Sequence, residues 1–230
     1  MVETAPRETP PEDGASTTKA IKVNVRTSIL IQILNVVSGL ELARGLGVTG
    51  RGELAAAILW PTVIGAIATL GLQESMTYHV ARDRGHAGTL LGSALGLWVI
   101  QSLLFTAITI GVVPLALQQH SHTVIIAGLI YSGYVSLNMY GLVLTGTLNG
   151  LHRYASYNAG ILSIGVTIVT LQTVLLAVGD FHVKTIVIGF MGCYVICMSF
   201  GTWLTKRAHP GQLHFDVRTM RKIFSYGIRS

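Results

Sequence analysis

The sequence predicts an all-α, polytopic membrane protein with six transmembrane helices. Hydrophobic residues make up 50% of the 230 residues, only 11% are charged, and the mean hydropathy is +0.58. A soluble domain carries roughly 25% charged residues, so this shortage indicates that lipid surrounds most of the chain. Arg153 is the only formally charged side chain between Arg84 and Asp180. So long an uncharged stretch does not suit a surface in water.

The first 18 residues differ sharply from the rest. They are rich in Pro, Glu and Thr and have almost no apolar side chains. Such a segment cannot bury enough surface to fold, so we predict a disordered tail over residues 1–18. It is not a signal peptide, because it is acidic and lacks a short apolar core. The net charge of +6 does not indicate nucleic-acid binding, since the basic residues form no stripe with interleaved aromatics.

Six apolar segments follow, each long enough to cross a bilayer, which takes about 20 residues. We predict them at 27–46, 53–72, 90–113, 123–148, 159–178 and 185–204. Residues 19–205 therefore form a six-helix transmembrane unit. Residues 206–222 are expected to form a basic connector. Residues 223–230 are expected to begin a truncated seventh helix, because their final residues resemble the entrance to the first helix and indicate a second copy of the unit.

The connection between the first two segments is rich in glycine. Gly45, Gly47, Gly50 and Gly52 predict a tight hairpin, because glycine adopts positive φ without a steric penalty. Within the second segment, Pro61 removes a backbone hydrogen bond, which predicts either a static bend or a hinge.

The distribution of Lys and Arg predicts that the N-terminus is cytoplasmic. Positive residues favour the cytoplasmic side of short loops. With this orientation, thirteen of the 16 Lys and Arg residues lie on the cytoplasmic side. The other three, Arg44, Arg51 and Lys184, lie outside. The tail and the connector are then both cytoplasmic.

Polar stripes interrupt the apolar helices. At about 100° per residue, Tyr131, Tyr134 and Asn138 share one face of the fourth segment, and Gln32 and Asn35 share one face of the first. Unpaired polar groups are unfavourable in hydrocarbon, so each face must meet another helix or a water-filled cavity. Both explanations stay open. Tyr and Asn also suit sugars, because they offer a flat apolar surface beside hydrogen-bonding groups.

Three stretches resemble a known family. The stretch LARGLGVTGRGE at 42–53, running into AAAILWP at 55–61, resembles the first two helices of bacterial polysaccharide flippases. These are the oligosaccharide and lipopolysaccharide exporters of the multidrug/oligosaccharidyl-lipid/polysaccharide superfamily. The segments 73–82 and 146–158 resemble the family's "L-G-L-x-x-A-x-T-Y-x-x-A-R" and "G-x-L-x-G-x-x-R-x-x-x-Y-N" patterns.

The resemblance implies the N-terminal lobe of a two-lobed transporter in the bacterial inner membrane. The implied function is to flip a lipid-linked oligosaccharide by alternating access, with coupling to an ion gradient. The expected partners are that substrate, membrane lipids, the missing C-terminal lobe and the polysaccharide polymerase machinery. Alternatives are a multidrug or cation antiporter of the same superfamily and a non-functional fragment of a flippase.

The resemblance also implies roles for charged residues. Arg44 would attract a pyrophosphate linker and Glu41 would exchange a coupling proton; alternatively, the two are spaced to form an ion pair on one helix face. Arg82, Arg84 and Arg153 would meet phosphates where the substrate loads, or would act only as positive-inside anchors.

No motif for catalysis is present, so we expect no enzymatic activity and no cofactor. His120 and His122 lack a third ligand nearby, so we expect no metal site.

Overall fold

The computed structural model describes residues 14–209 and 211–227, which form helices and their connections without any strand. The predicted all-α class is therefore confirmed for this part of the chain. The helices are α1 Gly14–Ala68, α2 Leu72–Arg82, α3 Ala87–Ala116, α4 His122–Tyr131, α5 Gly133–Gly150, α6 Tyr154–Val178, α7 Val183–Ala208 and α8 Val217–Gly227, with a short 3-10 helix η1 at Arg84–His86.

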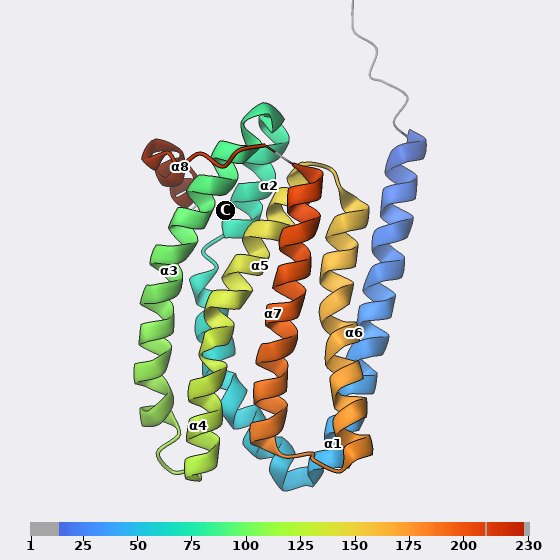
Figure 1. The fold of residues 1–230 in the computed structure, drawn as a ribbon, viewed down its shortest axis with the longest axis vertical. Helices are drawn as coiled ribbons and strands as arrows, with labels where there is room; N and C mark the ends of the chain where they lie inside the picture. Colours follow the sequence, from blue (N-terminus) through green and yellow to red (C-terminus); the bar gives the residue numbers. More distant parts are fainter. Residues whose placement is uncertain (1–13, 210, 228–230) are drawn as a thin grey trace, which may run out of the picture.

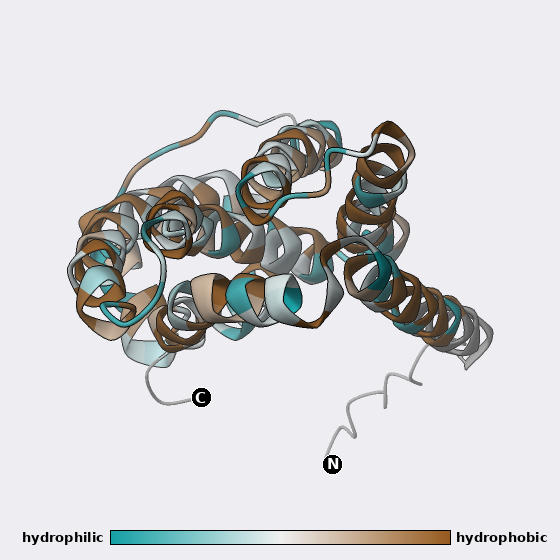
Figure 2. Cartoon of the chain, turned by 90° about the horizontal axis from the view of Figure 1, so that it is seen from below, coloured by the Kyte–Doolittle hydropathy of each residue, from teal (hydrophilic) through white to brown (hydrophobic). Residues whose placement is uncertain are grey.

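Across the described residues, five helical spans are long and apolar enough to cross a membrane, which indicates a membrane protein. We predicted six separate helices. The difference arises because the first span, Val25–Arg82, contains both of the first two predicted segments. The fourth predicted segment is a single span, but Ser132 divides it into α4 and α5. Most helical turns carry hydrophobic residues (Figure 2).

Helix α1 reverses direction at Gly47, at the lower end of the bundle in Figure 1. The backbone there has φ 66° and ψ −171°, a conformation essentially restricted to glycine. Within the predicted glycine hairpin, the helical conformation is therefore interrupted at Gly47 alone. We call residues 14–46 the first arm and residues 48–68 the second arm. Gly45 keeps a helical conformation and lies against the Phe181 ring, where a larger side chain would clash.

The boundaries of the predicted domains differ from the helices observed. Of the predicted disordered tail, residues 1–13 lie outside the described residues, whereas residues 14–18 form the first turns of α1. Helix propagation costs little once the apolar segment has nucleated, which explains this extension. At the other end, α7 continues through Ala208, and α8 begins at Val217 and includes residues 223–227. The helix that we expected to begin at 223 therefore begins earlier, and residues 228–230 lie outside the described part.

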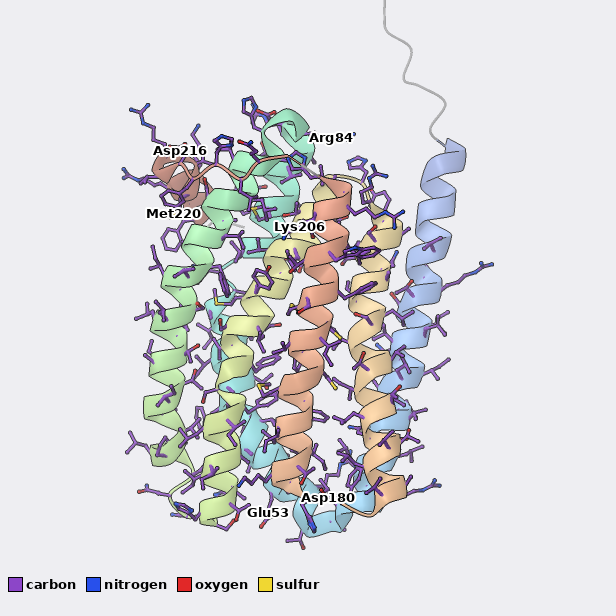
Figure 3. The ribbon with its side chains drawn as sticks, in the orientation of Figure 1. Glu53, Arg84, Asp180, Lys206, Asp216 and Met220 are labelled. Carbon is purple, nitrogen blue, oxygen red and sulfur yellow. The ribbon has the colours of Figure 1, made fainter. Side chains whose placement is uncertain are left out.

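Basic residues collect at one end of the bundle. The connections after α2, α5 and α7 lie at the upper end in Figure 1, together with α8, whereas the bend at Gly47 and the connections after α3 and α6 lie at the lower end. Figure 3 shows Arg84, Lys206 and Asp216 at the upper end, with Glu53 and Asp180 at the lower end. The two ends thus differ in charge as the sequence pattern predicts.

A segment after α7 lies on a row of glycines in α3. Gly88, Gly92 and Gly96 recur at every fourth position, a spacing that lets two helices approach closely in lipid. In the structure they instead accommodate residues 212–215, since a Cβ on Gly92 would meet the backbone of His214. Ser93 fixes the end of this segment, because its Oγ donates to the Asp216 carbonyl oxygen at 3.1 Å. The segment leads directly into α8.

We expect the substitution Gly47→Ala to lower the free energy of unfolding by about 2 kcal/mol, because an L side chain is strained in this backbone conformation. A Cβ at Gly47 meets no atom within 4 Å, so the effect isolates the backbone. Gly52→Ala is the matched control, since Gly52 is helical and also has open space around it. Chemical unfolding in detergent measures both. Equal stability of the two variants would show that the bend is not strained.

We expect Gly92→Leu to expel the segment 211–216 from α3. Overpacking of this kind costs about 2 kcal/mol, which raises the population with the segment released, and hence its cleavage, by about 30-fold. Limited trypsin digestion with mass spectrometry measures cleavage after Arg218, Arg221 and Lys222. Gly111→Leu is the control on the same helix, because a Cβ there meets open space. Cleavage at the same rate in both variants would contradict this role of Gly92.

Candidate functional site

A carboxylate lies between the first arm of α1 and α6. The Oγ1 of Thr173 donates a hydrogen bond of 2.6 Å to the Oε1 of Glu41, and the Oε2 of Glu41 is buried without a hydrogen-bond partner. At 1.5 Å per residue, Glu41 is about 9 Å along the helix from the bend at Gly47. The alternative of an ion pair between Glu41 and Arg44 is not realised in the structure, because Glu41 bonds to Thr173 and Arg44 is exposed. The spacing of residues along α1 gave no indication that Glu41 contacts Thr173 of α6.

The preceding residue of α6 adds a second unsatisfied group. Gln172 is completely buried, and neither its Nε2 nor its Oε1 has a hydrogen-bond partner. A buried amide without partners is strongly unfavourable, so such a group calls for a bound water, an ion or a functional role. Gln172 was not predicted from the sequence. Its signal was the single amide side chain among the aliphatic and threonine residues at 166–178.

Three tyrosines form a cluster in the interior. The rings of Tyr131 and Tyr134 stack with their centroids 5.1 Å apart, and Tyr194 of α7 meets Tyr134 edge-on at 5.2 Å. The shared face predicted for Tyr131 and Tyr134 therefore brings them together. Asn138 is partly buried one turn further along α5. Tyr194 was not predicted, because it comes from a different helix.

The polar residues of the first arm lie elsewhere. Gln32 and Asn35 are exposed on a face that also exposes large aliphatic residues, with Ile33 53% and Val36 63% exposed. This arm stands at the edge of the bundle in Figures 1 and 2. The structure therefore does not join Gln32 and Asn35 to the buried Tyr131 in one cavity.

The predicted loading residues all lie at the upper end but differ in their surroundings. Arg82 lines a cavity of about 600 Å³ between α2, α3 and α8, and its Nη1 donates to the Tyr78 hydroxyl at 3.1 Å. Arg84 in η1 and Arg153 before α6 are exposed and are not among the residues that line this cavity. All three are exposed, but only Arg82 lines a cavity.

Pro61 is buried in the second arm, where the helical backbone continues through it. The chain breaks further along, at Leu70 (φ 40°) and Gly71 (φ 65°), between α1 and α2. The hinge at Pro61 stays a prediction.

These features define a class of protein, a polytopic α-helical membrane protein with polar groups inside its helices. Within residues 14–209 and 211–227, no three His, Cys, Asp or Glu side chains are grouped to hold a metal ion. In comparisons with known proteins, the chain matches no family model, no curated protein and no solved structure.

We expect Thr173→Val to lower the free energy of unfolding by about 1 kcal/mol, because it removes the hydrogen bond between α6 and the first arm and leaves both oxygens of Glu41 unpaired. Thr170→Val is the matched control, since its hydroxyl bonds to the Val166 carbonyl oxygen of its own helix at 2.8 Å. Thermal unfolding in detergent compares the two. If Thr173→Val is as stable as the control, Glu41 does not hold these helices together.

Proposed function

We propose that this chain is the N-terminal lobe of a membrane transporter that flips a lipid-linked oligosaccharide across the bacterial inner membrane. The observation that carries the proposal is the Glu41 carboxylate inside the apolar helices. Ionisable side chains within membrane helices are rare, and they mark substrate pathways, ion pathways or proton relays. The resemblance of the α1 hairpin to polysaccharide flippases supports the choice of substrate.

Glu41 is suited to exchange a coupling proton or cation. Its Oε1 is held by Thr173, so the carboxylate is oriented, while its Oε2 has no partner and is available. Acidic side chains within membrane helices are common sites for coupling protons or cations in transporters. Gain or loss of that charge changes the attraction between the first arm and α6. Movement of the first arm would then open the cavity to alternate sides of the membrane.

The exposed polar residues on the first arm support the proposal that a second lobe packs against this face. If the two arms of α1 are counted separately, the lobe has six passes. Gln32 and Asn35 would face hydrocarbon if the lobe stood alone, which is unfavourable for their amides. A second lobe opposite this face would enclose a polar cavity for the sugars, while the lipid tail of the substrate stays in the bilayer.

The charge of the two ends supports an orientation with the N-terminus in the cytoplasm. The upper end of Figure 1, which holds most of the basic residues, is then cytoplasmic. Arg82, Arg84 and Arg153 would meet the phosphates of the substrate during loading. Arg44, exposed at the opposite end, would attract the pyrophosphate as the substrate reaches the outer leaflet.

A multidrug or cation antiporter of the same superfamily is the second candidate. Glu41 favours it, because an antiporter places an acidic group where cations bind. The two functions share the fold and differ in the substrate, so a measurement of cargo separates them.

The test is deletion of the complete gene and complementation with its full-length product. We expect deletion to reduce surface polysaccharide and to accumulate lipid-linked precursor on the inner leaflet. Wild-type protein and the control Glu53→Gln, at the lower end in Figure 3, should restore export, whereas Glu41→Gln at equal expression should not. Unchanged polysaccharide and precursor after deletion would refute the proposal. Drug sensitivity with normal polysaccharide would favour the antiporter.

A further inference from the structure

A second site lies at the upper end, apart from Glu41. The cavity of about 600 Å³ has one wall from the end of α2, one from the start of α3 and one from α8. Leu90 and Ile223 form its apolar part, and Thr89 and Thr219 contribute hydroxyls. Its cationic side chains, Arg82 and Lys222, come from different helices, and both are exposed to solvent.

The charges of this cavity are not balanced. Among the side chains that the structure describes, neither Arg82 nor Lys222 forms an ion pair with a carboxylate. The lining contains the acid Asp83, but its Oδ2 is 2.8 Å from Nδ1 of His86 and its Oδ1 accepts from the His86 backbone N–H. These hydrogen bonds hold the pKa of Asp83 below its ordinary value, so it stays ionised, and the lining carries two cations against one anion. In addition, Nε2 of His79 is buried without a partner. The cavity therefore presents two cations and an unused imidazole nitrogen.

The wall formed by α8 is held firmly in place. The buried Oγ of Ser75 donates to the Ile223 carbonyl oxygen at 2.8 Å, and the ring of Tyr226 stacks on Tyr78 with centroids 4.6 Å apart. At its other end, Asp216 caps α8 by accepting from the backbone N–H of Thr219 at 3.0 Å and from its hydroxyl. The same hydrogen bonds lower the pKa of Asp216. Lys222 is thus placed by the fold and not by a mobile tail.

The chemistry points to a phosphate group. Charge-assisted hydrogen bonds from guanidinium and ammonium groups to phosphate are among the strongest in proteins, and two cations from separate helices match its several oxygens. Exposed apolar side chains of the segment from 211 onward indicate that the group belongs to a lipid: Leu213 is 54%, Phe215 60% and Phe224 38% exposed. Leu213 and Phe215 belong to the non-helical segment before α8 and Phe224 to α8 itself. Exposed apolar side chains beside basic residues are typical of chains that lie in the membrane interface, and basic pockets beside membrane helices bind lipid headgroups.

We propose that this cavity binds the phosphate of an anionic phospholipid headgroup, held between Arg82 and Lys222. The site shares Arg82 with the proposed loading of the substrate, but its test measures lipid binding and requires no transport. The bound headgroup bridges α2 and α8, so it stabilises the docked position of α8 at the upper end (Figure 3).

The test measures binding of short-chain phosphatidylglycerol to the purified full chain in a neutral detergent, by native mass spectrometry and by the shift of the thermal midpoint. Arg82→Gln and Lys222→Gln should each weaken binding by about ten-fold, and Lys222→Arg should retain it. Arg207→Gln is the matched control, because Arg207 is an exposed cation at the same end that lies 5.5 Å from the Trp203 ring centre and outside the cavity.

Two further probes identify the source of the phosphate. Short-chain phosphatidylcholine tests whether a net negative charge is required, and inorganic phosphate tests whether the lipid is required. Selective binding of phosphatidylglycerol supports the proposal. Equal affinity for phosphatidylcholine, equal loss in Arg207→Gln, or inorganic phosphate binding as tightly as the lipid would each overturn it. If Arg82→Gln fails to fold, the comparison of Lys222→Gln with Lys222→Arg still decides the outcome.

Discussion

Inside hydrocarbon, every polar group of the chain must find its partner within the protein. The helical backbone meets this constraint, and so do the hydroxyls within the helices: Thr109 donates to the Phe105 carbonyl oxygen and Thr167 to that of Ser163, both at 2.7 Å. These bonds explain how polar stripes persist in apolar helices without forming a site. Against this background the exceptions are informative. They are one oxygen of Glu41, both polar atoms of Gln172, and, in α3, Oε1 of Gln101 and Oγ1 of Thr106, all buried without a partner.

The same constraint separates the two ends of the bundle from its middle. Charged side chains are solvated at the ends, where α8 and its preceding segment add a further polar layer over α2 and α3 (Figure 1). The bundle therefore offers two chemically different sites. Toward the lower end, Glu41 offers a carboxylate with few partners, suited to a small ion, and the upper end has cations with few partners, suited to an anion.

Local sequence signals predicted what depends on local chemistry. Apolar length predicted the membrane spans, and glycine content located the bend that includes Gly47. Pairings between distant segments were beyond those signals. Nothing near Gly92 indicates that the backbone of His214 lies against it, and nothing near Glu41 indicates Thr173. The burial of Gln172 likewise depends on how neighbouring helices pack. The sequence therefore identified polar residues by their positions on one helix, but it did not identify the residues of other helices that they contact.

The bend at Gly47 divides α1 into two arms that contact different helices. The first arm contacts α6, where Leu34 meets Gly165 and Glu41 meets Thr173, whereas the second arm contacts α4 and α5, where Ala57 meets Gly128 and Gly65 meets Tyr134. Beside the bend the two arms share one cluster, because Leu42 and Leu46 of the first arm pack with Leu54 and Ala57 of the second. A displacement of the first arm about Gly47 would therefore have to break these contacts first. The helix that bends at Gly47 thus joins two sets of neighbouring helices, and the shared cluster beside the bend couples them.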